Sequence, residues 1–152
     1  MKCILSWFTI LAVIIAGVSF FWAERTHAPT TEVPQGKISA ETANSVPGMI
    51  QVDIPVVNAT VASPLTVTGR ARGGWYFEAS FPLELKNAGG TVIATGIAQA
   101  QSDWMTDAFV PFTATLTYPA QPAGSTGTLV LKKDNPSGEP ANDMSLAIPV
   151  LF

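Results

Sequence analysis

The stretch YFEASFPLELK (residues 76–86) decides the fold class of this chain. Apolar residues occupy every second position from Phe77 to Leu85, and mostly polar residues stand between them. A repeat of two places successive side chains on opposite faces of an extended strand, so that one face is buried and the other is solvated. Residues 87–90, NAGG, follow at once and have the composition of a turn. The stretch therefore predicts a β-strand with an inward apolar face.

Six further runs of the same kind lie before and after it, separated by turns rich in Gly, Pro and Asn. Short strands at such regular spacing are typical of an all-β sandwich. We therefore expect an all-β domain from residue 49 to residue 152, a two-sheet β-sandwich of about seven strands. The six runs are residues 50–57, 65–72, 91–100, 109–118, 128–133 and 144–152.

The predicted core consists of the apolar members of these alternations. A domain of roughly 100 residues buries enough surface to fold without help from a metal or a disulfide. The predicted core residues are Val52, Ile54, Leu65, Val67, Phe77, Phe81, Leu83, Leu85, Val110, Phe112, Leu116, Leu129, Leu131, Leu146, Ile148 and Val150.

The first 23 residues differ in composition from the domain. Residues 4–23, ILSWFTILAVIIAGVSFFWA, carry no charge, and Trp7 and Trp22 stand near their two ends. About 20 helical residues span the hydrocarbon core of a bilayer, and tryptophan favours the headgroup interface. We therefore expect residues 1–23 to be an N-terminal transmembrane helix that anchors the protein in the cell membrane. The alternative is a signal sequence that is cleaved before Phe20 and leaves a secreted protein.

Residues 24–48 separate this segment from the strands. They contain no aromatic residue, carry Pro29, Pro34 and Pro47, and are rich in Thr, Ser, Ala and Glu. Because neither a helical nor a strand period runs through them, they predict a flexible linker. Lys2 before the apolar segment favours a cytoplasmic N-terminus and an extracytoplasmic C-terminal domain in a single-pass protein.

The domain contains no Cys or His, the side chains on which most nucleophilic enzymes depend. The chain has one Cys and one His; Cys3 lies at the membrane segment and His27 in the linker. Nucleophile–base pairs and structural zinc sites need such residues, so we expect no enzyme, no metal and no cofactor. The net charge of −3 and the lack of basic runs argue against nucleic-acid binding.

Three segments carry motifs that go beyond the alternation: VASPLTVTGRARGGWYFEASFPLEL (61–85), WMTDAFVPFTATLTY (104–118) and GTLVLKKDNPSGEP (127–140). Together they resemble the immunoglobulin-like domain of bacterial spore germination proteins, which also occurs in other bacterial surface proteins and lipoproteins. The resemblance implies an immunoglobulin-like β-sandwich in an exported, often membrane-tethered protein, and it implies no catalytic residue. The chain lacks a GerM-type partner domain, a lipobox cysteine and the cysteine pair of antibody domains.

Two groups of side chains are candidates for contact with a partner. Trp75, Tyr76 and Trp104 would stack on a sugar ring or anchor another protein if they are exposed. The alternative is that the tryptophans fill the core. Asp134 and Asn135 begin an oxygen-rich loop, which suits a turn capped by its own side chains and, as the alternative, a calcium ion.

These observations favour a noncatalytic, membrane-tethered, extracytoplasmic immunoglobulin-like module. Its expected partner is an envelope protein or a cell-wall glycan, and the resemblance links it to sporulation or germination. The alternative is a purely structural spacer or assembly subunit of a cell-envelope complex. An exposed aromatic patch would favour binding, whereas a uniformly polar surface would favour the spacer.

Overall fold

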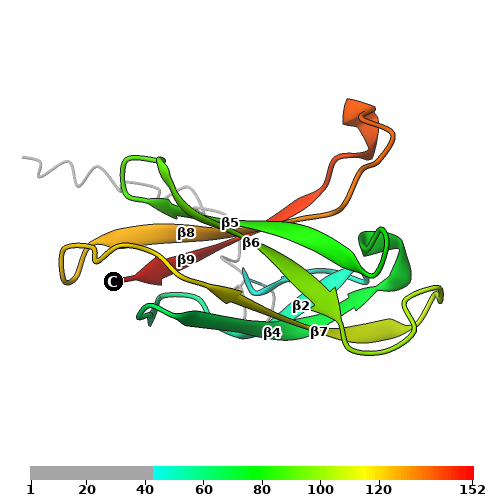
Figure 1. Cartoon of the computed structure of the whole chain (residues 1–152), viewed down its shortest axis with the longest axis horizontal. Helices are drawn as coiled ribbons and strands as arrows, with labels where there is room; N and C mark the ends of the chain where they lie inside the picture. Colours follow the sequence, from blue (N-terminus) through cyan, green and yellow to red (C-terminus); the bar gives the residue numbers. More distant parts are fainter. Residues whose placement is uncertain (1–42) are drawn as a thin grey trace, which may run out of the picture. The chain divides into compact units, whose positions relative to one another are not determined.

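The computed structural model describes residues 43–152, which form nine β-strands and two short 3-10 helices (Figure 1). The predicted transmembrane segment, residues 4–23, lies outside the described residues. Within residues 43–152, no helix is long and apolar enough to cross a membrane. The elements are β1 (Ser45–Val46), β2 (Ile50–Ile54), β3 (Ala59–Thr60), β4 (Leu65–Arg72), η1 (Gly73–Trp75), β5 (Ser80–Asn87), β6 (Val92–Ala100), β7 (Phe109–Leu116), β8 (Thr126–Lys132), η2 (Pro140–Asn142) and β9 (Ser145–Leu151).

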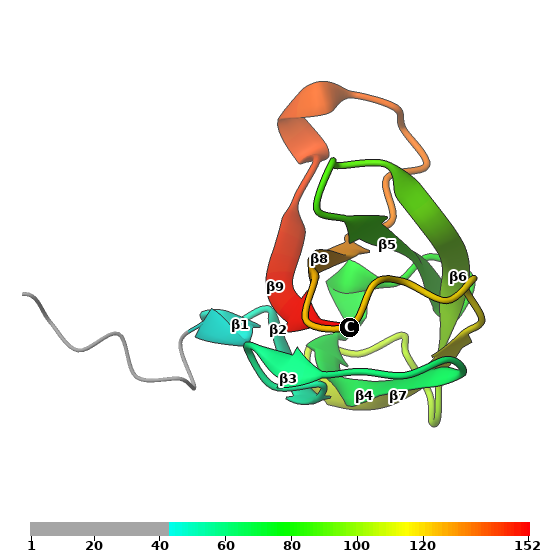
Figure 2. The ribbon, with the colours of Figure 1, turned by 90° about the vertical axis from the view of Figure 1, so that its left-hand side faces the viewer.

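All nine strands join into one curled sheet in the order β1-β2-β4-β7-β6-β5-β8-β9-β3. The curl produces two facing layers, with β2, β4 and β7 in one and β5, β8 and β9 in the other (Figures 1 and 2). The all-β prediction is confirmed. The layers were predicted as separate sheets, but β6 joins them, because it pairs with β5 along most of its length and with β7 at Gln99 and Ala100.

The strand order within each layer is that of an immunoglobulin-like sandwich. In that fold, strands A, B and E share one sheet and strands C, F and G share the other. Here β2, β4 and β7 occupy the places of A, B and E, and β5, β8 and β9 occupy those of C, F and G. The two strands that the sequence analysis did not predict, β1 and β3, have two residues each.

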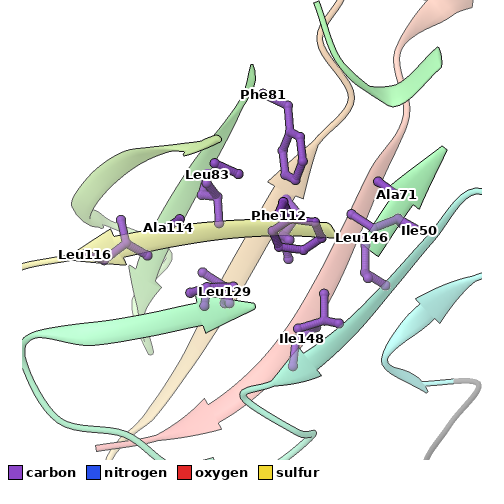
Figure 3. Close-up of a cluster of buried hydrophobic side chains, with 14 of the residues drawn as sticks. Ile50, Ala71, Phe81, Leu83, Phe112, Ala114, Leu116, Leu129, Leu146 and Ile148 are labelled. Carbon is purple, nitrogen blue, oxygen red and sulfur yellow. The ribbon is translucent and has the colours of Figure 1, made fainter. Parts of the chain in front are cut away.

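The core lies between the layers. In β4, β5, β8 and β9 every second side chain is buried, as the period of two predicts. The rings of Phe81 and Phe112 pack edge to face with centroids 5.0 Å apart (Figure 3). All the predicted core residues are buried except Ile54 and Phe77.

Ile54 is 55% exposed because β2 contains a bulge. Val52 pairs with Gly69, but Ile54 pairs with Thr68, so that Asp53 is an extra residue in this strand. One extra residue moves the next side chain to the opposite face of the sheet. The prediction that Ile54 points inward was wrong for this reason.

Phe77 is 41% exposed because the chain turns before β5 begins. Phe77 and Ser80 exchange both of their backbone hydrogen bonds, and Glu78 and Ala79 between them have φ angles of 49° and 61°. Two successive positive φ angles are characteristic of a tight two-residue turn. The alternation therefore starts at Ser80 rather than at Tyr76, and Tyr76, predicted on the polar face, is buried.

Residues 43–48, predicted as the end of the linker, extend the folded domain. β1 pairs with β2, and the buried Asn44 side chain donates to the carbonyls of Val52 and Pro55 while its oxygen accepts from the N–H of Val57. These bonds fasten the chain to the turn that follows β2. The preceding part of the chain therefore joins the domain at this turn.

Phe81→Ala is expected to lower the free energy of unfolding by about 3 to 5 kcal/mol, because it removes a fully buried ring and leaves a cavity. Glu84→Ala, on the opposite face of β5, is the matched control. Glu84 pairs with Lys86 and Lys132 at the surface, and such pairs contribute about 0 to 1 kcal/mol. Urea denaturation of a fragment of residues 36–152 compares the two variants. Equal losses would show that the register of β5 is wrong.

Asn44→Ala is expected to cost about 1 to 3 kcal/mol, because it leaves the N–H of Val57 without its hydrogen-bond partner. A fragment that starts at Met49 should lose at least as much stability as this variant. Circular dichroism in the presence of chelator and reductant is expected to show an all-β spectrum for residues 36–152. Equal urea midpoints for fragments 36–152 and 49–152 would contradict the role of Asn44.

Candidate functional site

Three loops gather at one end of the domain, where β4, β6 and β8 finish (Figure 1). We call this the distal end, and its loops distal loop 1 (73–79), distal loop 2 (101–108) and distal loop 3 (133–144). Because β2 is antiparallel to β4, the turn after β2, which Asn44 holds, points away from this end. All five predicted contact residues belong to the distal loops.

Backbone contacts tie the distal loops together. The amide of Asp134 in distal loop 3 donates to the carbonyl of Trp75 in distal loop 1 at 3.1 Å. Gly73 packs so closely on distal loop 2 that a Cβ there would lie 2.0 Å from the carbonyl oxygen of Thr106 and 2.2 Å from that of Trp104. Only glycine fits such a contact, so the three loops form one surface.

Arg72, the last residue of β4, makes a further contact with distal loop 2. Its guanidinium donates to the carbonyls of Gly48 and Asp107, and it lies 4.9 Å from the ring centroid of Phe109. A cation over an aromatic face is attracted by the ring quadrupole. Sequence reasoning missed this positioning role, because strand alternation indicates only that Arg72 points outward.

Trp75 and Tyr76, two of the predicted contact residues, belong to the core. Trp75 is fully buried, Tyr76 is 4% exposed, and both rings pack edge-on against Phe81. The Tyr76 hydroxyl donates to the carbonyl of Val110 at 2.7 Å. Burial raises the pKa of Tyr76 to about 12, so the phenol stays protonated. Neither ring offers a stacking surface to a partner, and the core interpretation of Trp75 is confirmed.

Trp104, in distal loop 2, has a more accessible position. It is partly buried, it packs against the core, and it lines a pocket of about 350 Å³ with Met105 and Asp107. Met105 is 77% exposed. Trp104 therefore anchors the loop, while Met105 supplies the exposed apolar surface beside the pocket.

Asn135 organises distal loop 3. Its side-chain amide donates to the carbonyl of Glu139 at 2.9 Å and to a carboxylate oxygen of Asp143 at 2.8 Å. Its side-chain oxygen accepts from the Ser137 hydroxyl at 2.6 Å. These bonds confirm the predicted turn capped by its own side chains. Among residues 43–152, no group of three or more His, Cys, Asp or Glu side chains could hold a metal ion.

A second pocket, of about 440 Å³, lies beside distal loop 3. Its lining combines side chains of both charges with two apolar ones, and Met144 among them is 40% exposed. Lys132 donates to Glu84 on the neighbouring strand, and this hydrogen bond lowers the pKa of the Glu84 carboxyl. The lining residues are Pro82, Lys132, Lys133, Asp134, Asn135, Asp143, Met144 and Ser145.

Four large apolar side chains are exposed at the distal end, and two of them, Met105 and Met144, line these pockets. Phe77 is 41% exposed, Met105 77%, Phe109 39% and Met144 40%. Aromatic residues and methionine are enriched where proteins contact one another. Sequence reasoning missed all four as contact residues. It placed Phe77 in the core, and nothing in the strand alternation marks a loop methionine as exposed.

The comparison with protein families identifies the domain. Residues 49–139 match the family described as the immunoglobulin-like domain of bacterial spore germination, Gmad2, and this match covers more than half of the 152 residues. The chain belongs to the Gmad2 family. No curated protein and no solved structure matches it. The Gmad2 match confirms the resemblance found in the sequence motifs, and it includes distal loops 1 and 2 completely.

Gly73→Ala is expected to force distal loops 1 and 2 apart, because the added methyl group would overlap two backbone carbonyls. Overpacking of this kind costs about 1 to 3 kcal/mol. Gly74→Ala is the matched control, since a Cβ at Gly74 has no atom within 4 Å. Urea denaturation and amide hydrogen exchange in distal loop 2 measure the difference. Equal stability of the two variants would contradict the close contact.

Proposed function

We propose that this Gmad2 domain is a noncatalytic binding module of the bacterial cell envelope that presents its distal end to another envelope protein. The observation that carries the proposal is the group of exposed apolar side chains at the distal end: Phe77, Met105 and Met144 on the tied loops, and Phe109 at the start of β7. Membership of the Gmad2 family supports a role in sporulation or germination.

The chemistry of the distal end favours a protein partner over a glycan. A sugar ring stacks on a flat, open aromatic face. Trp75 is buried and Trp104 packs against the core, so the largest aromatic faces are turned inward. The most exposed apolar side chain at this end is Met105, and the flexible thioether of methionine adapts to an apolar protein surface.

A purely structural spacer is less well supported. A spacer is expected to have a uniformly polar surface, whereas the distal end has exposed apolar side chains next to two pockets. Exposed apolar groups within a polar rim are typical of contact sites. Glu78, Asp103, Asp107 and Glu139 supply charged side chains on the same loops.

The proposed location is the cell membrane. Residues 4–23 have the length, hydropathy and flanking tryptophans of a single transmembrane helix, and Lys2 favours an extracytoplasmic domain. The domain joins the preceding chain opposite its distal end, as the bonds of Asn44 indicate. An anchor at the N-terminus would therefore leave the distal loops free to meet a partner.

Met105 is the best position for a test in living cells. A photo-crosslinking amino acid at Met105 of the full-length protein is expected to give a discrete adduct with one envelope protein. The same amino acid at Thr95, an exposed position on β6 away from the distal loops, is the control. Similar adducts from both positions would contradict a distal binding site. An adduct that muramidase digests would indicate a glycan, and the absence of any adduct would favour the spacer.

N-terminal sequencing of the mature protein tests the anchor separately. A retained transmembrane helix is expected to leave the chain starting at Met1 or Lys2, in the membrane fraction. A start at Phe20 would show that the segment is a cleaved signal sequence and that the protein is secreted.

A further inference from the structure

The end of the domain opposite the distal end, which we call the proximal end, includes two long loops, the short turn between β5 and β6 (88–91) and Phe152. Loop 55–64 follows β2 and loop 117–125 precedes β8. The amide of Tyr118 donates to the hydroxyl oxygen of Ser63 at 3.0 Å, and the ring centroids of Tyr118 and Phe152 are 5.5 Å apart. These contacts join the two loops into one surface.

The two ends differ sharply in charge. Neither loop 55–64 nor loop 117–125 contains an Asp, Glu, Lys or Arg residue; Asp53 lines the pocket at this end, and Lys86 lies near the end of β5. The distal loops, in contrast, include a basic residue and six acidic ones: Lys133, Glu78, Asp103, Asp107, Asp134, Glu139 and Asp143. The two proximal loops are therefore uncharged, whereas the distal loops are charged.

Apolar side chains are exposed at the proximal end. The bulge in β2 turns Ile54 outward, and Ile54 and Val56 are 55% and 56% exposed. They border a pocket of about 490 Å³ whose walls are largely apolar, with Val61, Pro64 and Leu65 among its lining residues. A soluble domain that meets only water rarely keeps such a patch, so another surface is expected to cover it.

The place where the preceding chain joins the domain indicates which surface covers this patch. Asn44 is hydrogen-bonded to Pro55 and Val57, which flank Val56 in the exposed turn. Residues 24–43 lie between Asn44 and the predicted transmembrane segment, and the flexible linker predicted for them would have a root-mean-square reach of about 20 to 30 Å. The proximal end would thus be the part of the domain that a membrane anchor holds nearest to the lipid.

We propose that the proximal end docks on the bilayer surface, with Ile54 and Val56 inserted among the lipid headgroups. This inference rests on the proposed membrane tether and adds an orientation to it. Insertion of apolar side chains without basic neighbours needs no anionic lipid, so a zwitterionic surface suffices. The docked domain would point its distal loops away from the membrane, toward the proposed envelope partner.

The test uses the full-length chain with Cys3→Ser in phosphatidylcholine vesicles. A nitrobenzoxadiazole fluorophore is attached to Val56→Cys in one sample and to Met105→Cys in the other. Nitroxide-labelled lipid is expected to quench the fluorophore at position 56 by about twofold or more and to leave position 105 unchanged. Iodide in the water should quench in the opposite order.

Flotation of the vesicles separates the two proposals. Protein that does not float with the vesicles would overturn the tether and this orientation together. Protein that floats while position 56 is open to iodide would overturn the docking alone. Protection of position 56 from both quenchers would also overturn it, because the patch would then be covered by a second copy or by the linker of the same chain.

A substitution in the patch provides a second measurement. Ile54→Glu, combined with the fluorophore at position 56, should reduce quenching by nitroxide lipid to the level seen at position 105. Because Ile54 is more than half exposed, this change leaves the core intact. Ile97→Glu, at a 52% exposed position on β6 away from the proximal end, is the matched control and should leave the quenching unchanged. Unaltered quenching in the Ile54→Glu protein would overturn insertion at this turn.

Discussion

The packing of Phe81 between the two layers is the interaction on which the rest of the structure depends. Its ring contacts Phe112 from the facing layer and the rings of Trp75 and Tyr76 from the segment just before β5. Aromatic side chains bury the largest apolar area per residue, so this cluster contributes strongly to the stability of a domain without a disulfide in its described part. Because Trp75 and Tyr76 belong to the cluster, the core also determines the path of distal loop 1.

The candidate site follows from that path. Trp75 is held in the core, and its carbonyl accepts a hydrogen bond from distal loop 3, while Gly73 two residues earlier packs on distal loop 2. A contact surface made of three loops is thereby supported by rigid elements, which lowers the entropy lost on binding. Arg72 adds a link to the turn at Gly48. The exposed side chains of Phe77 and Met105 lie on backbone that these contacts hold in place.

The two ends of this Gmad2 domain differ in the charge of their loops, and this difference distinguishes the end proposed to meet a partner from the end proposed to meet the membrane. Immunoglobulin-like sandwiches have loops at both ends, and the fold alone does not say which end meets a partner. In this chain the charged residues gather at the distal loops, and the uncharged turn with Ile54 and Val56 lies where the preceding chain joins the domain. The proposed membrane contact and the proposed protein contact therefore use opposite ends and do not compete for surface.

The sequence by itself determined the all-β class, the main strands and 14 of the 22 buried apolar side chains among residues 43–152, because the direction of a side chain in a strand depends only on the local repeat of two. It also determined the family, through motifs spread over three segments, and the self-capped turn at Asn135. Only the tertiary structure decided that Tyr76 is buried and Phe77 exposed, since a tight turn formed by Glu78 and Ala79 carries no glycine or asparagine to announce it. The tertiary structure also decided two further features, the bulge at Asp53 and the close contact between Gly73 and the carbonyl of Thr106. Both arise from contacts between segments that are distant in the sequence.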